Sequence, residues 1–129
     1  VNVGDSRLYL KRGKTLSRIT EDQTLAKFLL DEGEITAEQA RTHYSKDLID
    51  QCVGYGECDP ATGTLAVKDG DILLFATDGL HKPVPDEQIF RILDRPEPLE
   101  QMADSLIRSA LDKGGPDNVT VILGRIHPG

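Results

Sequence analysis

Apolar and polar positions alternate in short runs over much of the chain, and these runs predict β-strands arranged in hairpins. Two such runs flank Arg12-Gly13 within residues 6–20, and two more flank Asp69-Gly70 within residues 64–77. An X-Gly pair between two β-prone runs is a strong hairpin signal. The last run, residues 118–126, is rich in β-branched side chains and predicts a central strand.

Helical spacing of apolar positions appears in the remaining segments. The clearest helix covers residues 97–115 and stops at a glycine pair; its apolar stripe is Leu99, Met102, Ala103, Leu106, Ile107, Ala110 and Leu111. Other helices are predicted for residues 24–33, for a short stretch opened by the capping box at 36–39, for 45–54 and for 85–95. Strands in hairpins and helices in a row predict an α+β fold, in which helices cover an antiparallel sheet.

Composition narrows the class of protein. The 129 residues fit one domain, residues 1–129, and 38% hydrophobic residues suit a globular protein. The net charge of -7, without a basic stripe, argues against nucleic-acid binding, and no apolar run is long enough to span a membrane. Two cysteines, Cys52 and Cys58, are too few for a disulfide framework; they favour the reducing cytoplasm and small thiols that are buried or half-buried.

Three aspartates lie where an expected strand begins or ends: Asp5 in GDSR, Asp78 in FATDGL and Asp117 in GPDNVT. A carboxylate beside a β-rich core is costly unless it is paired, hydrogen-bonded or bound to a cation. Strand ends from distant parts of a chain can converge at one sheet edge, and a divalent ion would offset the repulsion there, because Mg²⁺ and Mn²⁺ prefer oxygen ligands. Taken singly, Asp78 and Asp117 can also be turn residues, and Asp5 can cap a turn or pair with Arg7.

Other catalytic chemistry finds little support. The three histidines, at positions 43, 81 and 127, lack metal-ligand spacing and are expected at the surface. No phosphate-binding G-x-x-x-x-G-K-[ST] loop occurs, and Ser6 lies in no nucleophile elbow. Neither cysteine is followed six positions later by the arginine of a tyrosine-phosphatase loop. Water activated by a metal remains the favoured nucleophile.

Taken together and in this order, four stretches resemble the PP2C family of metal-dependent serine/threonine protein phosphatases, and its compact bacterial branch more than its eukaryotic one. They are VNVGDSRLYL, LSRITEDQTLAKFLLDEGEIT, GDILLFATDGL and GGPDNVTVILGRI. The resemblance implies two antiparallel sheets packed face to face, flanked by helices, with a binuclear Mg²⁺ or Mn²⁺ centre at one edge. By motif match, Asp78 and Asp117 would be metal ligands, and Asp5 would lie at a third, weaker metal site that shares Asp78. Gly79 and Asn118 would contribute backbone groups or support the ligands.

The resemblance also implies a mechanism and a substrate. A metal-bridging hydroxide would attack phosphorus directly, so no side chain would act as the catalytic nucleophile. The substrates would be proteins phosphorylated on serine or threonine, such as the targets of a Ser/Thr kinase. Residues 21–54 would form a mobile flap beside the site.

Two departures from the family pattern qualify this expectation. The family's first half is missing, including the D-G-x-G motif whose aspartate bridges both metals, another acidic ligand and the arginine that holds the phosphate. The chain, which begins at Val1 rather than Met, is therefore expected to be a C-terminal piece that is inactive alone. His81-Lys82 also stands where the family usually has an acidic or amide residue, so Lys82 either lowers metal affinity or points to solvent.

Two alternatives remain open at this stage. A pseudophosphatase or regulatory binding module would keep the scaffold without the chemistry. A carboxylate-rich cation module of other ancestry is less favoured, because the sequence has no EF-hand loop.

Overall fold

A computed structural model describes residues 1–54, 56 and 58–127 and divides the chain into two packing units. The first unit combines Val1–Ser6 with Glu21–Thr64, and the second combines Arg7–Thr20 with Leu65–Gly129. The predicted flap segment, residues 21–54, falls within the first unit.

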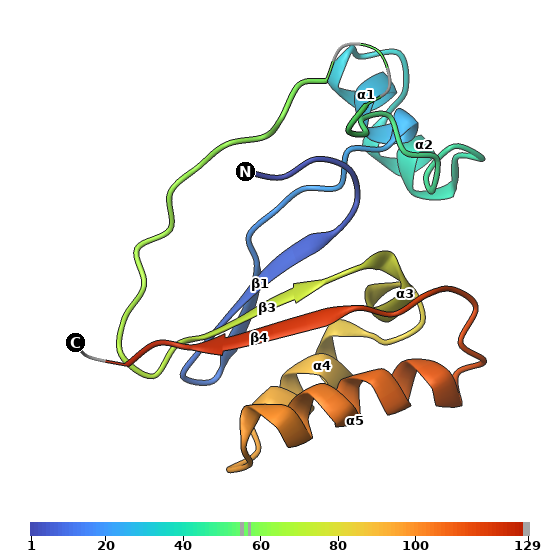
Figure 1. The fold of residues 1–129 in the computed structure, drawn as a ribbon. Helices are drawn as coiled ribbons and strands as arrows, with labels where there is room; N and C mark the ends of the chain where they lie inside the picture. Colours follow the sequence, from blue (N-terminus) through green and yellow to red (C-terminus); the bar gives the residue numbers. More distant parts are fainter. Residues whose placement is uncertain (55, 57, 128–129) are drawn as a thin grey trace. The chain divides into compact units, whose positions relative to one another are not determined.

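An antiparallel sheet organises the second unit (Figure 1). Its strands are β1 (Arg7–Arg12), β2 (Thr15–Arg18), β3 (Ile72–Ala76) and β4 (Val121–Arg125), in the spatial order β2-β1-β3-β4. Each neighbouring pair is antiparallel, which confirms the α+β prediction and the hairpin at Arg12-Gly13. The prediction that the last strand is central was wrong, because β4 lies at the edge of the sheet.

The second predicted hairpin is only half correct. β3 forms as expected, but residues 64–68 are not a strand. The reason is topological: β1 and β4 already pair with the two sides of β3, so no side is left for the preceding run. A tight turn survives at Asp69-Gly70, where the Asp71 amide donates to the Lys68 carbonyl at 3.1 Å and Gly70 has a φ of +80°.

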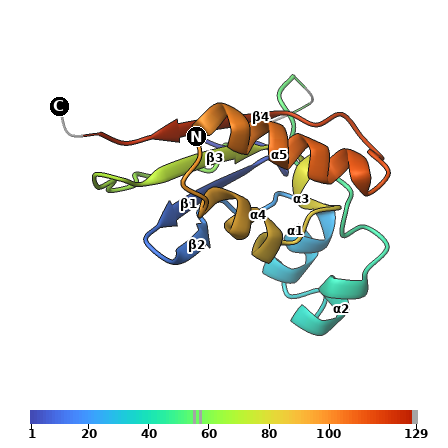
Figure 2. The same ribbon diagram turned by 90° about the horizontal axis from the view of Figure 1, so that it is seen from below.

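Three helices cover one face of the sheet (Figures 1 and 2): α3 (Asp78–His81), α4 (Asp86–Leu93) and α5 (Leu99–Asp112). Pro85 and Pro98 precede the last two helices, at positions where a missing N–H has no cost. Helix α5 buries Met102, Leu106 and Ala110, which confirms the predicted stripe, although Leu111 is 57% exposed. The fully buried core joins both layers: Tyr9, Leu74, Leu80, Val84, Ile89, Met102, Leu106 and Ala110.

The other face of the sheet remains apolar and exposed. Side chains alternate between the two faces of a strand, so Phe75 and its cross-strand partner Ile122 point away from the helices. Phe75 is 47% exposed and Ile122 is 62% exposed. This is the face that a second sheet would cover in the sandwich expected from the sequence.

The first unit contains two short helices, α1 (Leu25–Asp31) and α2 (Ala37–Thr42). The predicted capping box opens α2: the Thr36 hydroxyl accepts from the Gln39 amide at 3.2 Å, and the Gln39 side chain accepts from the Thr36 amide at 2.8 Å.

The helix predicted for residues 45–54 was wrong. The Leu48 carbonyl accepts from the Leu25 amide at 2.8 Å, and the Asp50 amide donates to the Gln23 carbonyl at 2.9 Å. These two backbone groups are therefore hydrogen-bonded to the segment that precedes and enters α1, and they cannot form the hydrogen bonds of a helix. Ser45, the first residue of the predicted helix, is buried and hydrogen-bonded to the His43 ring at 2.6 Å.

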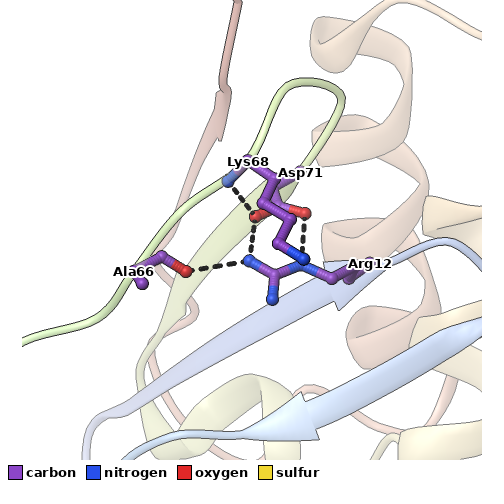
Figure 3. Close-up of polar contacts among 4 residues, drawn as sticks. All are labelled: Arg12, Ala66, Lys68 and Asp71. Atoms are coloured by element: carbon purple, nitrogen blue, oxygen red, sulfur yellow. Dashed lines mark hydrogen bonds and ion pairs between the residues drawn. The ribbon is translucent and has the colours of Figure 1, made fainter.

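A partly buried ion pair between Arg12 and Asp71 fixes the turn before β3 (Figure 3). The Asp71 carboxylate accepts from Nε of Arg12 at 2.9 Å, from Nη2 of Arg12 at 2.6 Å and from the Lys68 amide at 2.7 Å. Arg12 Nη2 also donates to the Ala66 carbonyl at 2.8 Å. Asp71 is 1% exposed, and its own carbonyl accepts from the Ile126 amide at 2.9 Å. The Asp71 carboxylate thus links β1 to the turn, and its backbone carbonyl links the turn to the residue that follows β4.

This ion pair predicts a specific loss of stability in acid. The hydrogen bonds from Arg12 lower the pKa of Asp71 from 3.8 to about 2. A lowered folded-state pKa stabilises the fold above the unfolded value, and this contribution is lost as pH falls from about 4 towards 2. Urea unfolding from pH 5 to pH 2 should show the loss. Asp71→Asn should be less stable than the parent chain at pH 5, because its amide N–H₂ would face the Arg12 donors, and the difference should shrink towards pH 2. A constant difference across this range would contradict the assignment.

Candidate functional site

Asp78 is positioned by an abrupt change from strand to helix. β3 ends at Ala76, Thr77 takes the extended N-cap conformation, and Asp78 is the first residue of α3. The buried strand therefore ends on a carboxylate because a short helix, which the sequence pattern did not reveal, begins there. The Asp78 side chain is 23% exposed at this corner.

Lys82 is the principal partner of Asp78. Its ammonium lies 2.7 Å from Oδ2 of Asp78, one helical turn further along the chain. This hydrogen bond is the main reason why the pKa of Asp78 is lowered. Mutual repulsion among the predicted carboxylates would instead raise that pKa. In this chain the ammonium group of Lys82 thus neutralises the charge of Asp78.

Gly79 allows two distant segments to come into close contact. A Cβ added at Gly79 would lie 2.2 Å from the Asn118 carbonyl oxygen and 2.9 Å from its carbon. Both are backbone atoms, so only glycine fits here. Thr77 strengthens the contact: its amide donates to the Thr120 carbonyl at 3.1 Å, and its hydroxyl accepts from the Thr120 amide at 3.0 Å. The end of β3 and the approach to β4 therefore meet at one edge of the sheet.

Asp117 belongs to the second of these segments. It is exposed and precedes Asn118, whose amide donates to Asp117 Oδ1 at 2.7 Å. This local bond is typical of an aspartate that shapes a turn. Asp78 and Asp117 are thus carried on two segments that contact each other through Gly79 and Asn118.

Asp5 lies in the first unit and is 7% exposed. Gly4 before it has a φ of +91°, and its amide donates to Oε1 of Gln23 at 2.8 Å. The Gln23 amide donates to the Gly4 carbonyl at 3.0 Å, and Nε2 of Gln23 donates to the Asp59 carbonyl at 2.9 Å. Gln23 therefore fixes the segment that carries Asp5. A metal site shared by Asp5 and Asp78 stays a prediction.

The described residues do not by themselves make a complete metal site. Among the residues that the structure describes, no group of three or more His, Cys, Asp or Glu side chains could hold a metal ion. A two-metal centre needs more oxygen ligands than Asp78 and Asp117 supply.

Two other predictions about candidate residues need correction. His81 is 8% exposed rather than a surface residue, because it lies on the buried side of α3. Cys52 is exposed rather than buried, whereas Cys58 is half-buried. Both cysteines are free thiols.

Known phosphatases resemble this chain over nearly its whole length. The chain is 43% identical over 126 residues to the serine/threonine protein phosphatase PstP of Mycobacterium tuberculosis, covering 98% of the chain and 24% of that protein. It is 37% identical over 123 residues to the protein phosphatase PhpP of Streptococcus pneumoniae, covering 95% of the chain and 50% of that protein. The chain is homologous over nearly its whole length to PP2C-type (PPM) serine/threonine protein phosphatases. No family model matches it.

Solved structures of PP2C-type phosphatases have the same fold as this chain. The M. tuberculosis phosphatase PstP/Ppp matches with a TM-score of 0.84 at 41% identity, over 98% of the chain and 54% of the solved one. The S. agalactiae serine/threonine phosphatase matches with a TM-score of 0.84 at 33% identity, over 94% of the chain and 50% of the solved one. The chain thus spans about half, or less, of these relatives. No helix within the described part is long and apolar enough to cross a membrane.

Proposed function

We propose that this chain is the C-terminal part of the catalytic domain of a metal-dependent protein serine/threonine phosphatase. The observation that carries the proposal is the contact of Gly79 with Asn118. This contact holds the segment with Asp78 and the segment with Asp117 together at one sheet edge. In the proposed reaction the nucleophile is a metal-bound water, so no side chain has to act as one.

In this proposal the described residues bind and position metal ions. Asp78 and Asp117 are ligands of a binuclear Mg²⁺ or Mn²⁺ centre, and Asp5 belongs to a third site. A crystal structure of the catalytic domain of the serine/threonine protein phosphatase PstP contains two manganese ions, which supports metal dependence in a relative. When bound, such ions lower the pKa of a coordinated water and neutralise the oxygens of a phosphoryl group. Gly79 and Asn118 keep the ligand-bearing segments in contact.

The substrates, by the same proposal, are proteins phosphorylated on serine or threonine, such as those modified by a Ser/Thr kinase. The names of the relatives support this class. Residues 21–54 act as a flap beside the site. The two free cysteines support a reducing, cytoplasmic location.

The deciding experiment compares two lengths of the protein. A full-length phosphatase that carries this chain should hydrolyse a phosphothreonine peptide in the presence of Mn²⁺. This activity should be lost when EDTA removes the metal. The 129-residue chain alone should show little or no EDTA-sensitive turnover of p-nitrophenyl phosphate, because its ligand set is incomplete. Robust turnover by the isolated chain would contradict the incomplete-site proposal, and an inactive full-length protein would contradict the phosphatase proposal.

One observation favours a second function. Lys82 already neutralises Asp78 and would have to leave it before a metal could bind to that oxygen. A non-catalytic pseudophosphatase or regulatory module would keep this ion pair permanently. The full-length experiment separates the two functions, since only the phosphatase shows Mn²⁺-dependent turnover.

A further inference from the structure

A groove between α4 and α5 is lined by basic side chains. It has a volume of about 390 Å³, within the range of about 300–1,000 Å³ typical of small-molecule sites. Arg91 and Arg95 line it from the α4 side, and Arg108 lines it from α5. Asp78 and Asp117 are not among its lining residues, so the groove is separate from the proposed metal site.

The lining carries positive charge without an acidic side chain. Gln88, Ser105, Ser109 and Ile92 complete it, and none of these is ionisable. A concentration of three guanidinium groups is notable in a chain whose net charge is -7. Guanidinium groups bind phosphate oxygens bidentately, so the composition favours an anion.

The arginines are available to a ligand. No ion pair of Arg108 is found among the described residues. Arg95 approaches Glu97 only to 4.0 Å, and Arg91 pairs with Glu87 one helical turn away, where both side chains are more than 70% exposed. Exposed pairs of this kind contribute roughly 0–1 kcal/mol, so a multivalent anion can displace them at little cost.

The neutral polar side chains add hydrogen-bonding capacity. The Ser109 hydroxyl donates to the Ser105 carbonyl at 2.8 Å, which holds it in a fixed orientation. The side-chain amide of Gln88 and the Ser105 hydroxyl make no hydrogen bond within the described residues and can donate to a ligand. Donors thus lie on both helices that form the groove.

We propose that the α4–α5 groove, defined by Gln88, Arg91, Arg95, Ser105, Arg108 and Ser109, binds a ligand that carries two or more phosphate groups. Each of the three guanidinium groups can bind phosphate oxygens bidentately, and the volume of the groove leaves room for more than one phosphate. Such a ligand is either a free diphosphate-containing molecule or a doubly phosphorylated segment of a protein.

Calorimetric titration of the 129-residue chain in EDTA tests the proposal, with inorganic pyrophosphate in one arm and a peptide bearing two phosphothreonines in the other. Saturable 1:1 binding in either arm is expected, and the tighter arm identifies the source of the phosphates. NMR amide shifts should concentrate on α4 and α5. Arg95→Gln and Arg108→Gln should each weaken binding about tenfold or more.

Arg125→Gln is the matched control, because it removes the same charge from β4, and its affinity should stay within about twofold of the parent chain. Absence of saturable binding in both arms would overturn the proposal. Equal weakening by Arg125→Gln and Arg108→Gln would also overturn it, since that result indicates attraction to net charge alone. Because no metal is present, the outcome does not depend on the phosphatase proposal.

Discussion

Replacing Asp78 by asparagine should reduce Mn²⁺-dependent turnover of a full-length phosphatase that carries this chain by about 100-fold or more. The substitution keeps the size of the side chain and removes the charge that the proposed metal centre needs. Phosphopeptide hydrolysis over a range of Mn²⁺ concentrations measures the effect. Excess Mn²⁺ should restore little activity, because a neutral amide oxygen is a weaker ligand than a carboxylate for a hard cation.

Asp69→Asn provides the matched control, since it makes the same chemical change at the other Asp-Gly pair. Asp69 is exposed in the tight turn before β3, and turns of this kind accept asparagine. Turnover and melting temperature should therefore stay close to those of the parent protein. Without metal, Asp78→Asn should melt slightly lower, because it loses the ion pair with Lys82. Full activity of Asp78→Asn, or inactivity of Asp69→Asn, would refute the assignment of Asp78.

The elements that the sequence predicted correctly depend on local signals. The capping box at Thr36 and Gln39 forms both of its hydrogen bonds, and α5 buries the predicted stripe around Met102 and Leu106. The hairpin at Arg12-Gly13 is equally local. In each case the residues that determine the structure lie within a few positions of one another.

The wrong predictions involve residues whose backbone partners are distant in sequence. Residues 64–68 have strand propensity, but β1 and β4 occupy both sides of β3. Residues 45–54 have a plausible helix start, but Leu48 and Asp50 pair with the segment entering α1. The strand β4 looks central because it is β-branched, yet it lies at an edge. Such outcomes require knowledge of the strand order and of other long-range backbone pairing, which no local pattern contains.

For the candidate site, sequence motifs indicated the important segments better than the contacts that hold those segments in place. Asp78 and Asp117 were singled out as corner residues, and their segments do contact each other through Gly79. Asp71 was missed, although a charged residue directly before a buried strand is the signal that could have revealed its pairing with Arg12. Gln23 was missed as well, because a single glutamine in a polar stretch gives no signal of its three-segment hydrogen bonding.

Gly79→Ala should lower the free energy of unfolding of the 129-residue chain by about 2–3 kcal/mol. The new Cβ would lie 2.2 Å from the Asn118 carbonyl oxygen, far inside van der Waals contact, and the obstructing atoms belong to the backbone. The approach to β4 would therefore have to move away from α3, which strains the Thr77–Thr120 hydrogen bonds. Urea unfolding followed by circular dichroism measures the loss.

Gly124→Ala is the matched control, because it adds the same methyl group in β4 where no atom lies within 4 Å of the new Cβ. Its stability should stay within about 0.5 kcal/mol of the parent chain or rise slightly, since alanine restricts the unfolded chain. In a full-length phosphatase, Gly79→Ala should also raise the Mn²⁺ concentration needed for half-maximal turnover, because Asp78 and Asp117 would move apart. Equal stability of the two alanine variants would show that the close contact at Gly79 does not constrain the site, and the geometric basis for placing the two ligands together would be lost.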